Sequence, residues 1–155
     1  MKNESNKQKV EKMTDSFARE CIAFRMRIIS RVLTNTYDSC LRPLGVKVAQ
    51  LNIMVVTALL GVARPIEVCE RLQMDVSTLS RNVERMKRKG WLETVAGEDL
   101  RAQPFQLTKA GLKMLEESGP AWKQAQKKAK QLLGEEGVTA IDNIVERIRS
   151  GSSKR

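Results

Sequence analysis

The segment covering residues 65–108 constrains the fold more than any other part of this 155-residue chain. It opens with a proline at the start of a short amphipathic stretch, 65–72, which predicts a helix with the proline in its first turn. A second helical stretch, 75–90, follows after a short turn. Two strand-like stretches, 91–95 and 103–107, then flank a glycine-containing tip and are typical of a β-hairpin. The sequence therefore predicts two helices joined by a tight turn and followed by a hairpin.

The second of these helices has two chemically distinct faces. Leu79, Val83 and Met86 recur at the spacing of one helix face and are expected to point into the core. The other face carries short hydrogen-bonding groups near the helix start and guanidinium groups further along: Ser77, Thr78, Ser80, Arg81, Asn82 and Arg85. A helix in the DNA major groove presents such groups to base edges and phosphates. The order of elements is that of a winged helix-turn-helix, and the alternative is an ordinary surface helix with a solvated polar face.

The residues around this helix fit the winged arrangement. The expected buried side of the preceding helix consists of Ile66, Val68, Cys69 and Leu72. Cys69 would be the small residue where two helices cross closely. Gly90 fits the position just past the end of the second helix, where a left-handed residue is common. Pro104 cannot donate a ladder hydrogen bond, so we expect it at an edge or an end of the hairpin.

Composition narrows the possible functions. The 28 Lys and Arg residues exceed the 18 Asp and Glu residues, and the formal net charge of +10 favours a polyanionic partner. The chain has no histidine and no glycine loop of the phosphate-binding type, so we expect no enzyme activity, catalytic residue, metal site or cofactor. No apolar run approaches the ~20 residues that span a bilayer. Residues 1–15 lack a secretory apolar region, and we expect a cytoplasmic protein.

The helices expected at the two ends of the chain have apolar sides that need partners. Residues 15–41 predict one helix with two apolar stripes: Phe17, Cys21, Phe24, Ile28 and Val32, and Ile22, Met26, Ile29, Leu33, Tyr37 and Cys40 or Leu41. A last helix is expected to begin at Gly134, with the apolar side Val138, Ile141, Ile144, Val145 and Ile148. A second copy of the chain would cover these stripes. The alternative is a central helix that is buried within a monomer.

The remaining stretches complete one integrated domain. Residues 42–45 stop the first helix, and 48–60 predict an apolar helix in the core. Thr108 is a suitable N-cap for a helix that continues, with a kink or a short break at Gly119 and Pro120, toward residue 133. We expect a mainly α fold with a small β-hairpin wing, dimeric through its N- and C-terminal helices. Residues 1–45 and 108–155 would form the helical dimerisation region, and 46–107 the winged helix-turn-helix DNA-binding region.

Four short segments carry a family resemblance. They are Leu41-Arg42-Pro43-Leu44-Gly45-Val46, Val68-Cys69-Glu70-Arg71-Leu72, Ser77-Thr78-Leu79-Ser80-Arg81 through Lys89-Gly90-Trp91-Leu92-Glu93, and Asp99-Leu100-Arg101 leading to Leu107-Thr108-Lys109-Ala110-Gly111. In this order they resemble the MarR family of bacterial transcriptional regulators, over nearly the whole chain. The resemblance implies a mainly α dimer that the terminal helices form, with one winged module in each subunit. DNA binding in this family is often relieved by a small ligand or by cysteine oxidation.

Two features depart from the family pattern. Gln73 stands where many members have the glycine of the turn, so its backbone would be strained if the turn needs a positive φ. The wing is short and has Arg101 as its single basic residue. Arg101 matches the family's wing-tip arginine, which enters the minor groove, and Asp99 matches the acidic residue that orients it. The alternative is an exposed ion pair that contributes little.

The residues predicted to contact DNA come from the second helix and the wing. They are Ser77, Thr78, Ser80, Arg81, Asn82, Arg85, Lys87, Arg88, Asp99 and Arg101. Direct base readout is expected from Ser77, Thr78, Arg81 and Asn82, and phosphate contacts from Arg85, Lys87 and Arg88. The family resemblance also implies an effector pocket between the dimer helices and the winged module. Phe24, Ile28 and Met54 are candidate lining residues, although core packing is the commoner role for each.

Together these inferences predict a sequence-specific DNA-binding transcriptional regulator, a repressor that acts as a homodimer on an inverted repeat with half-sites ~10 bp apart. The resemblance suggests a small aromatic or phenolic effector. One alternative is redox regulation through Cys21, Cys40 or Cys69, but buried small-residue roles are favoured because the chain has no histidine to activate a thiol. Another is a winged module for protein interaction or DNA architecture without sequence specificity. The uncharged helix start, residues 77–80, argues against purely electrostatic binding.

Overall fold

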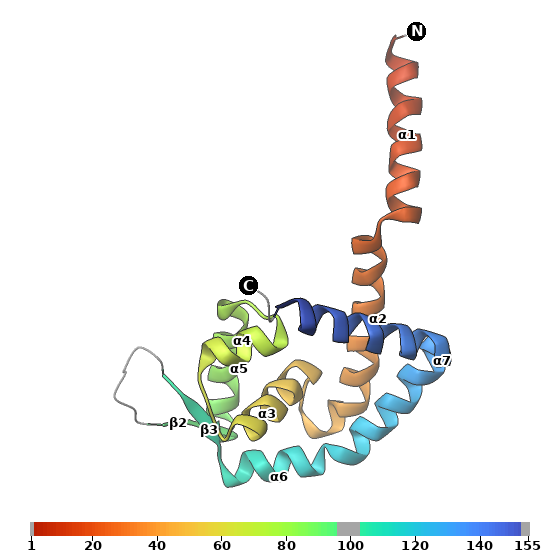
Figure 1. The fold of residues 1–155 in the computed structure, drawn as a ribbon. Helices are drawn as coiled ribbons and strands as arrows, with labels where there is room; N and C mark the ends of the chain where they lie inside the picture. The colour runs from red at the N-terminus through yellow and green to blue at the C-terminus, as the bar shows by residue number, and fades with distance from the viewer. Residues whose placement is uncertain (1, 96–102, 153–155) are drawn as a thin grey trace. The chain divides into compact units, whose positions relative to one another are not determined.

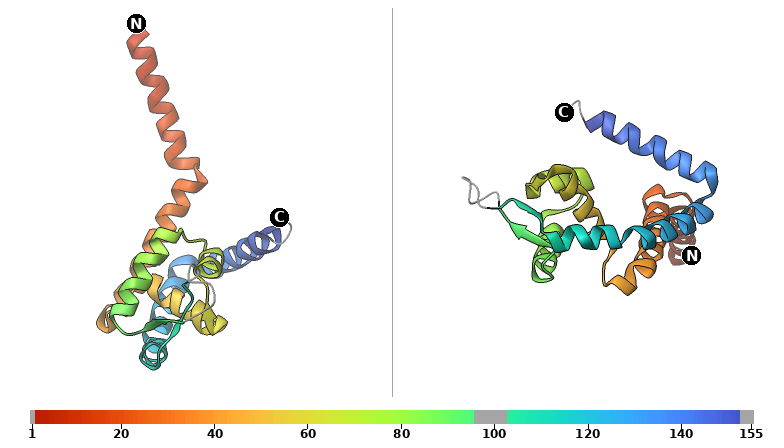
Figure 2. Two further views of the ribbon diagram at one scale, coloured as in Figure 1. Left: turned by 90° about the vertical axis from the view of Figure 1, so that its left-hand side faces the viewer. Right: turned by 90° about the horizontal axis from the view of Figure 1, so that it is seen from below.

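The computed structural model describes residues 2–95 and 103–152 (Figures 1 and 2). Its elements in chain order are α1 (Lys2–Glu20), α2 (Ile22–Leu41), the 3₁₀ helix η1 (Arg42–Leu44), α3 (Val48–Leu60), β1 (Val62–Ala63), α4 (Pro65–Leu72), α5 (Val76–Arg88), β2 (Leu92–Thr94), β3 (Phe105–Leu107), α6 (Lys109–Glu117) and α7 (Gly119–Ser152). The predicted mainly helical fold with a small hairpin is confirmed. The chain divides into two compact units between residues 35 and 36.

The N-terminal unit differs from the sequence prediction at two places. Its first helix begins at residue 2 and not near Asp15, and the predicted single helix is interrupted at Cys21. The hydrogen-bond ladder continues across the interruption, since the Cys21 N–H donates to the carbonyl of Phe17 (3.2 Å). Polar composition concealed the start of α1, because Lys, Glu and Gln are good helix formers without forming an apolar stripe. An ion pair between Asp15 and Arg19 (2.8 Å) also bridges one turn of this helix.

The core of the second unit forms around α3, as the apolar run at 48–60 predicts. Ile53 and Met54 are fully buried on α3, which packs against α4, α5, α6 and the sheet. The other core residues are Leu41, Val46, Leu51, Val56, Ala63, Val68, Cys69, Leu79, Val83, Met86, Trp91, Leu92 and Phe105. Leu59 is an exception on α3, with 73% of its surface exposed.

The buried side of α4 is narrower than predicted. Val68 and Cys69 are buried and Leu72 is half-buried, but Ile66 is exposed. At about 100° per residue, Ile66 lies roughly 110° from the centre of the arc that the other three share. The prediction that Ile66 is buried was therefore wrong, because α4 buries only one narrow arc of its surface.

The predicted hairpin is present as β2 and β3, paired antiparallel with Leu92 opposite Leu107. β1 adds a third strand on the other side of β3, with Val62 opposite Gln106. The sequence did not predict this strand because two residues are too few to show an alternating pattern. Pro104 lies immediately before β3, at the end position that its missing N–H requires.

Three positions adopt the left-handed backbone that their turns require. Gly45 (φ 66°) follows η1, and Gly90 (φ 72°) follows α5 where the sequence predicts a glycine cap. Gln73 (φ 49°) closes the turn between α4 and α5, so the strain expected of a non-glycine residue there is present. The Gln73 side-chain amide donates to the carbonyl of Glu70 (2.8 Å), which fixes the turn locally.

α6 packs closely against the start of the hairpin. Thr108 caps it as predicted, since its hydroxyl accepts from the backbone N–H of Gly111 (3.0 Å). A Cβ at Gly111 would lie 2.1 Å from the carbonyl oxygen of Trp91, so this contact requires glycine. α7 begins at Gly119, where the sequence predicts a kink or a short break, and Gly134 (φ 69°, ψ 168°) breaks it where the sequence predicts a new helix.

Exposed apolar side chains occur on α1 and α2 and on the end of α7. They include Phe17, Ile22, Phe24, Met26, Ile28, Ile144, Val145 and Ile148. Among the helices in residues 2–95 and 103–152, none by itself combines the length and the hydropathy that a membrane span requires. The segments 22–44 and 48–60 meet the length and composition requirement only as a pair bent by 81°.

Candidate nucleic-acid interface

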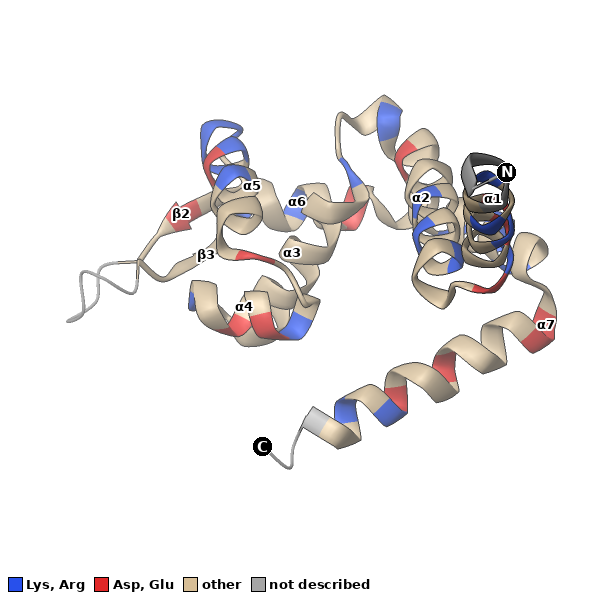
Figure 3. Cartoon of the chain, turned by 90° about the horizontal axis from the view of Figure 1, so that it is seen from above, with Lys and Arg blue, Asp and Glu red and all other residues tan. Residues whose placement is uncertain are grey.

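α5 carries the candidate interface, and its buried face is as predicted: Leu79, Val83 and Met86 are buried. The residues predicted to contact DNA lie outside this buried face of α5. Ser77, Ser80, Arg81, Arg85 and Arg88 are exposed, and Thr78, Asn82 and Lys87 are half-buried. Lys and Arg gather at one end of α5, which is its last turn (Figure 3). The helix therefore separates uncharged polar groups at its start from cations at its end.

Asp75 caps the start of α5 and orders the residues beside it. Its Oδ1 accepts from the Ser77 hydroxyl (2.6 Å) and from the backbone N–H of Thr78 (2.8 Å). These hydrogen bonds, the one from the Ser77 side chain first, hold the pKa of Asp75 well below its ordinary value. Because the Ser77 hydroxyl proton is committed to Asp75, the Ser77 oxygen is left to accept a hydrogen bond from a ligand.

Arg81 and Asn82 are held against the preceding turn of the helix. The Arg81 guanidinium donates to the Ser77 carbonyl (3.2 Å) and to the Thr78 hydroxyl (3.3 Å). The Asn82 side-chain amide donates to the Thr78 carbonyl (2.9 Å). Both bonds from Arg81 are long, so base-edge acceptors can replace them at little cost. The structure therefore brings together the predicted base-reading groups around Thr78.

The cations at the end of α5 have different surroundings. The Lys87 ammonium pairs with Glu84 (3.6 Å), so its charge is partly compensated. Within residues 6–95 and 103–151, neither Arg85 nor Arg88 has an ion-pair partner. Both arginines line an open cavity of about 410 Å³ at the corner between α5 and the start of α3. Either guanidinium is free to bind a phosphate there.

This cavity adds residues that the sequence did not single out. Its lining consists of Gly45, Lys47, Gln50, Asn82, Arg85, Arg88 and Lys89. Lys47 and Gln50 come from the start of α3, and the Lys47 ammonium lies 3.4 Å from the carboxylate of Asp38. No periodic pattern links α3 to α5, so the folded chain alone reveals this neighbourhood. Asp99 and Arg101, the predicted wing residues, lie outside the described residues.

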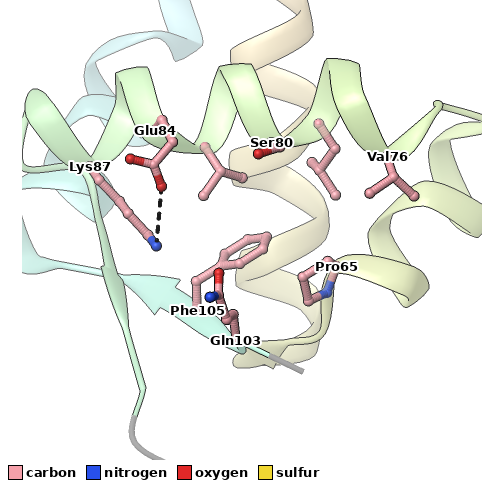
Figure 4. Close-up of a pocket in the computed structure, with 9 residues that line it drawn as sticks. Pro65, Val76, Ser80, Glu84, Lys87, Gln103 and Phe105 are labelled. Atoms are coloured by element: carbon pink, nitrogen blue, oxygen red, sulfur yellow. Dashed lines mark ion pairs between the residues drawn. The ribbon is translucent and has the colours of Figure 1, made fainter. Parts of the chain in front are cut away.

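A smaller cavity of about 220 Å³ lies between α5 and β3. Leu79, Val83 and Phe105 give it an apolar lining, and the ion pair of Lys87 with Glu84 lies along one side (Figure 4). Pro65, Val76, Ser80 and Gln103 complete the lining. Its apolar interior suits a small ring, and an acidic group on that ring would compete with the Glu84 carboxylate for the Lys87 ammonium. No sequence pattern indicates this cavity, because its lining residues come from three separate segments.

The three residues predicted to line an effector pocket have different environments. Met54 is fully buried in the core, the role that the sequence favours for it. Phe24 and Ile28 are exposed on α2 in the N-terminal unit. Their contribution to a pocket remains a prediction.

The cysteines differ from the prediction at one position. Cys40 and Cys69 are buried as expected, but Cys21 is exposed at the interruption between α1 and α2. Burial raises the pKa of the Cys69 thiol, and the carboxylates of Asp75 and Glu70 raise it further. Less thiolate is then present at neutral pH, so Cys69 is a poor nucleophile.

The sequence comparisons match one curated relative but no family model. The relative is YwoH of Bacillus subtilis, described as an uncharacterised HTH-type transcriptional regulator. It is 26% identical over 88 residues, which are 57% of this chain and 64% of the relative. The matched part of this chain thus spans less than two thirds of that protein.

Structural comparisons cover far more of the chain. A crystal structure of a MarR mutant from Escherichia coli complexed with operator DNA matches with a TM-score of 0.74 at 18% identity, covering 86% of this chain and 96% of that one. MosR of Mycobacterium tuberculosis in complex with DNA matches at 0.73 and 27% identity, covering 88% and 100%. BpsR of Bordetella bronchiseptica, whose DNA binding is regulated by 6-hydroxynicotinic acid, matches at 0.74 and 19%, covering 86% and 95%.

Proposed function

We propose that this chain, whose fold matches MarR-type winged helix-turn-helix structures, is a sequence-specific DNA-binding transcriptional regulator that acts as a homodimer. The observation that carries this proposal is the arrangement of α5. Its apolar face is buried, its uncharged polar groups cluster at the start, and its cations lie in the last turn. A recognition helix uses its N-terminal residues on base edges and its flanks on the phosphates. The net charge of +10 favours the same partner.

Each predicted residue then has a distinct role. The base edges are proposed to be read by Ser77, Thr78, Arg81 and Asn82, and Arg81 exchanges its long intrahelical hydrogen bonds for base acceptors. Ser80 is proposed to contact DNA beside them. Arg85, Lys87 and Arg88 bind the backbone phosphates, with Lys87 the weakest because Glu84 already pairs with it. Arg101, oriented by Asp99, is proposed to enter the minor groove, where negative potential attracts a guanidinium group.

Exposed apolar side chains at both ends of the chain support the homodimer. Ile22 is 74% exposed on α2, and Ile144 and Val145 are also exposed on α7. A second copy would bury such surfaces, as closed homodimers commonly do. We therefore propose that the protein dimerises through residues 1–45 and 108–155. Residues 46–107 of each copy would bind one half-site of an inverted-repeat operator whose half-sites are ~10 bp apart. We propose that binding within a promoter blocks transcription, so that the protein acts as a repressor.

Relief by a small aromatic or phenolic acid is the proposed regulation. The cavity between α5 and β3 supports it, because an apolar ring would contact Phe105 and Leu79 while its acidic group displaces Glu84 from the Lys87 ammonium. A ligand in this cavity would pair with the Lys87 ammonium, which is proposed to bind a DNA phosphate. Tenfold relief of DNA binding needs only ~1.4 kcal/mol of differential affinity. BpsR, whose DNA binding an aromatic acid regulates, is a precedent for this kind of effector.

The test of this function compares two duplexes at one stated salt concentration. One is a duplex that the protein selects from a random-sequence pool, and the other has the same composition in shuffled order. We expect the selected duplex to bind at least about 10³-fold more tightly. Equal affinities would instead support an architectural protein that binds DNA without sequence specificity, and no binding would support a protein-interaction module.

Redox control through a thiol is the second candidate, favoured by the exposure of Cys21. A variant with Ser at positions 21, 40 and 69 separates it from ligand control. Both proteins would be assayed for DNA release by peroxide and by a panel of aromatic acids. We expect the acids to act on both proteins equally. Release by peroxide that occurs only in the parent protein would make it a redox sensor.

A further inference from the structure

Lys89 lies at the point where the chain reverses after α5. The N–H of Gly90 donates to the Lys87 carbonyl (2.8 Å), and the N–H of Trp91 donates to the Met86 carbonyl (2.9 Å). These two bonds form a Schellman cap, which the positive φ of Gly90 permits. The cap turns the Trp91 ring back toward the end of the helix. The Lys89 ammonium consequently lies 4.3 Å from the centroid of this ring.

The same ammonium also reaches a distant part of the chain. It donates to the backbone carbonyl of Gly45 (2.6 Å), 44 residues earlier in the sequence. Gly45 follows η1 and forms the corner between α2 and α3. This corner is itself braced, because the N–H of Val48 donates to the Asp38 carboxylate (2.8 Å), which belongs to α2. Lys89 therefore ties the end of α5 to a fixed corner of the fold.

We propose that Lys89 is a positioning residue for DNA recognition, which rests on the proposed function of α5. The start of α5 is fixed by its Asp75 cap and by the turn from α4. The Lys89 ammonium, held between the Gly45 carbonyl and the Trp91 ring, fixes the other end. Base readout needs side chains placed within about 0.5 Å, so an anchor at each end of the helix maintains selectivity. A hydrogen bond from a charged group and a cation–π contact are strong enough for this role.

Three variants separate positioning from a direct phosphate contact. Lys89→Met removes the ammonium but keeps an unbranched stem, and Lys89→Arg retains a cation that can donate and stack. Lys113→Met is the matched control, because it removes the same charge from an exposed lysine on α6. The probes are the duplex that the wild-type protein selects and its shuffled counterpart.

We expect Lys89→Met to lower the ratio of the two affinities about tenfold, with Lys89→Arg restoring most of it and Lys113→Met leaving it unchanged. A phosphate contact would behave differently, since it would weaken both duplexes by the same factor and reduce the salt slope by about one. That result, or an unchanged ratio in Lys89→Met, would overturn the inference. A wild-type protein that prefers neither duplex would instead contradict the proposed function.

A second readout reports the contact without DNA. Trp91 and Trp122 are the two tryptophans of the chain, so a Trp122→Phe background makes Trp91 the single tryptophan, which excitation near the red edge distinguishes from Tyr37. In this background, Lys89→Met should change the Trp91 emission intensity, and Lys113→Met should not. Unchanged emission in Lys89→Met would mean that the ammonium does not lie over the ring in solution, which also overturns the inference.

Discussion

The helix-turn-helix core and the terminal helices bury their apolar side chains in different ways. In the core, Leu79, Met86 and Phe105 have at most 1% of their surface exposed. On the terminal helices, Ile22 is 74% and Phe17 62% exposed in the single chain. The first region therefore completes its packing alone, whereas the second has apolar surface that a partner copy is proposed to cover. Substitutions in the core should consequently change the free energy of unfolding, and substitutions on the terminal helices should change the dimerisation equilibrium.

The largest expected effect breaks the proposed assembly. Ile22→Asp combined with Phe24→Asp would place two carboxylates in the dimer interface, where burying an unpaired charge costs several kcal/mol. We expect sedimentation velocity to show a monomer and the selected duplex to bind about a hundredfold or more weakly, because one half-site contact is lost. Leu59→Asp is the control, an equally exposed apolar residue on α3, and should remain dimeric. A double variant that sediments as a dimer would contradict this use of the surface.

In the core, Leu79→Ala should destabilise the chain by about 2–5 kcal/mol, because it leaves a cavity beneath α5. Val76→Ala is the matched change on the same helix, since Val76 is 62% exposed, and should change stability by less than about 0.5 kcal/mol. Denaturant unfolding measures both values. Similar losses for the two variants would mean that α5 does not pack as described.

On the face of α5 that is proposed to contact DNA, substitutions should lower the affinity for DNA and leave stability nearly unchanged. Arg81→Ala is expected to cost about 1–3 kcal/mol on the selected duplex and to flatten the preference among sequences. Lys87→Ala should weaken all duplexes alike and lower the salt slope by about one. Electrophoretic or fluorescence titration at several salt concentrations distinguishes them. Identical behaviour of the two variants would argue that α5 does not read bases.

The smallest effect concerns the cap of α5 and its dependence on pH. Because the folded-state pKa of Asp75 lies below its unfolded value, the cap contributes stability above about pH 4 and loses it as the pH falls further. Asp75→Ala should therefore destabilise the protein at pH 7 by more than it does at pH 3. Thermal unfolding at both values measures the difference. An equal loss at both pH values would mean that the ionised carboxylate does not cap the helix.

The same contrast between regions explains how much the sequence could predict. α3, α4 and α5 were predicted with nearly their observed limits, because burial imposes periodicity and because Asp75 and Gly90 are suitable residues for the helix ends. The first residues of α1 and the interruption at Cys21 were missed. A solvated helix needs no apolar pattern, so its limits leave little trace in the sequence.

For the candidate site, the sequence could predict side chains on one helix but not neighbours from distant segments. The residues of α5 from Ser77 to Arg88 share a continuous stretch, so their common surface follows from helical geometry. Lys47 and Gln50 join Arg85 and Arg88 only because α3 and the end of α5 meet in the folded chain. The contact from Lys89 to Gly45 spans 44 positions and has the same origin. The tip of the wing, with Asp99 and Arg101, remains a prediction from family resemblance.

The most direct measurement of the central claim uses the selected duplex with about five base pairs inserted between its half-sites. This insertion rotates one half-site by about half a helical turn, so two α5 helices in a fixed dimer can no longer reach both major grooves. We predict that affinity falls toward that of the shuffled duplex, while each half-site sequence is intact. Unchanged affinity for the duplex with the insertion would contradict recognition by a dimer with one helix in each major groove.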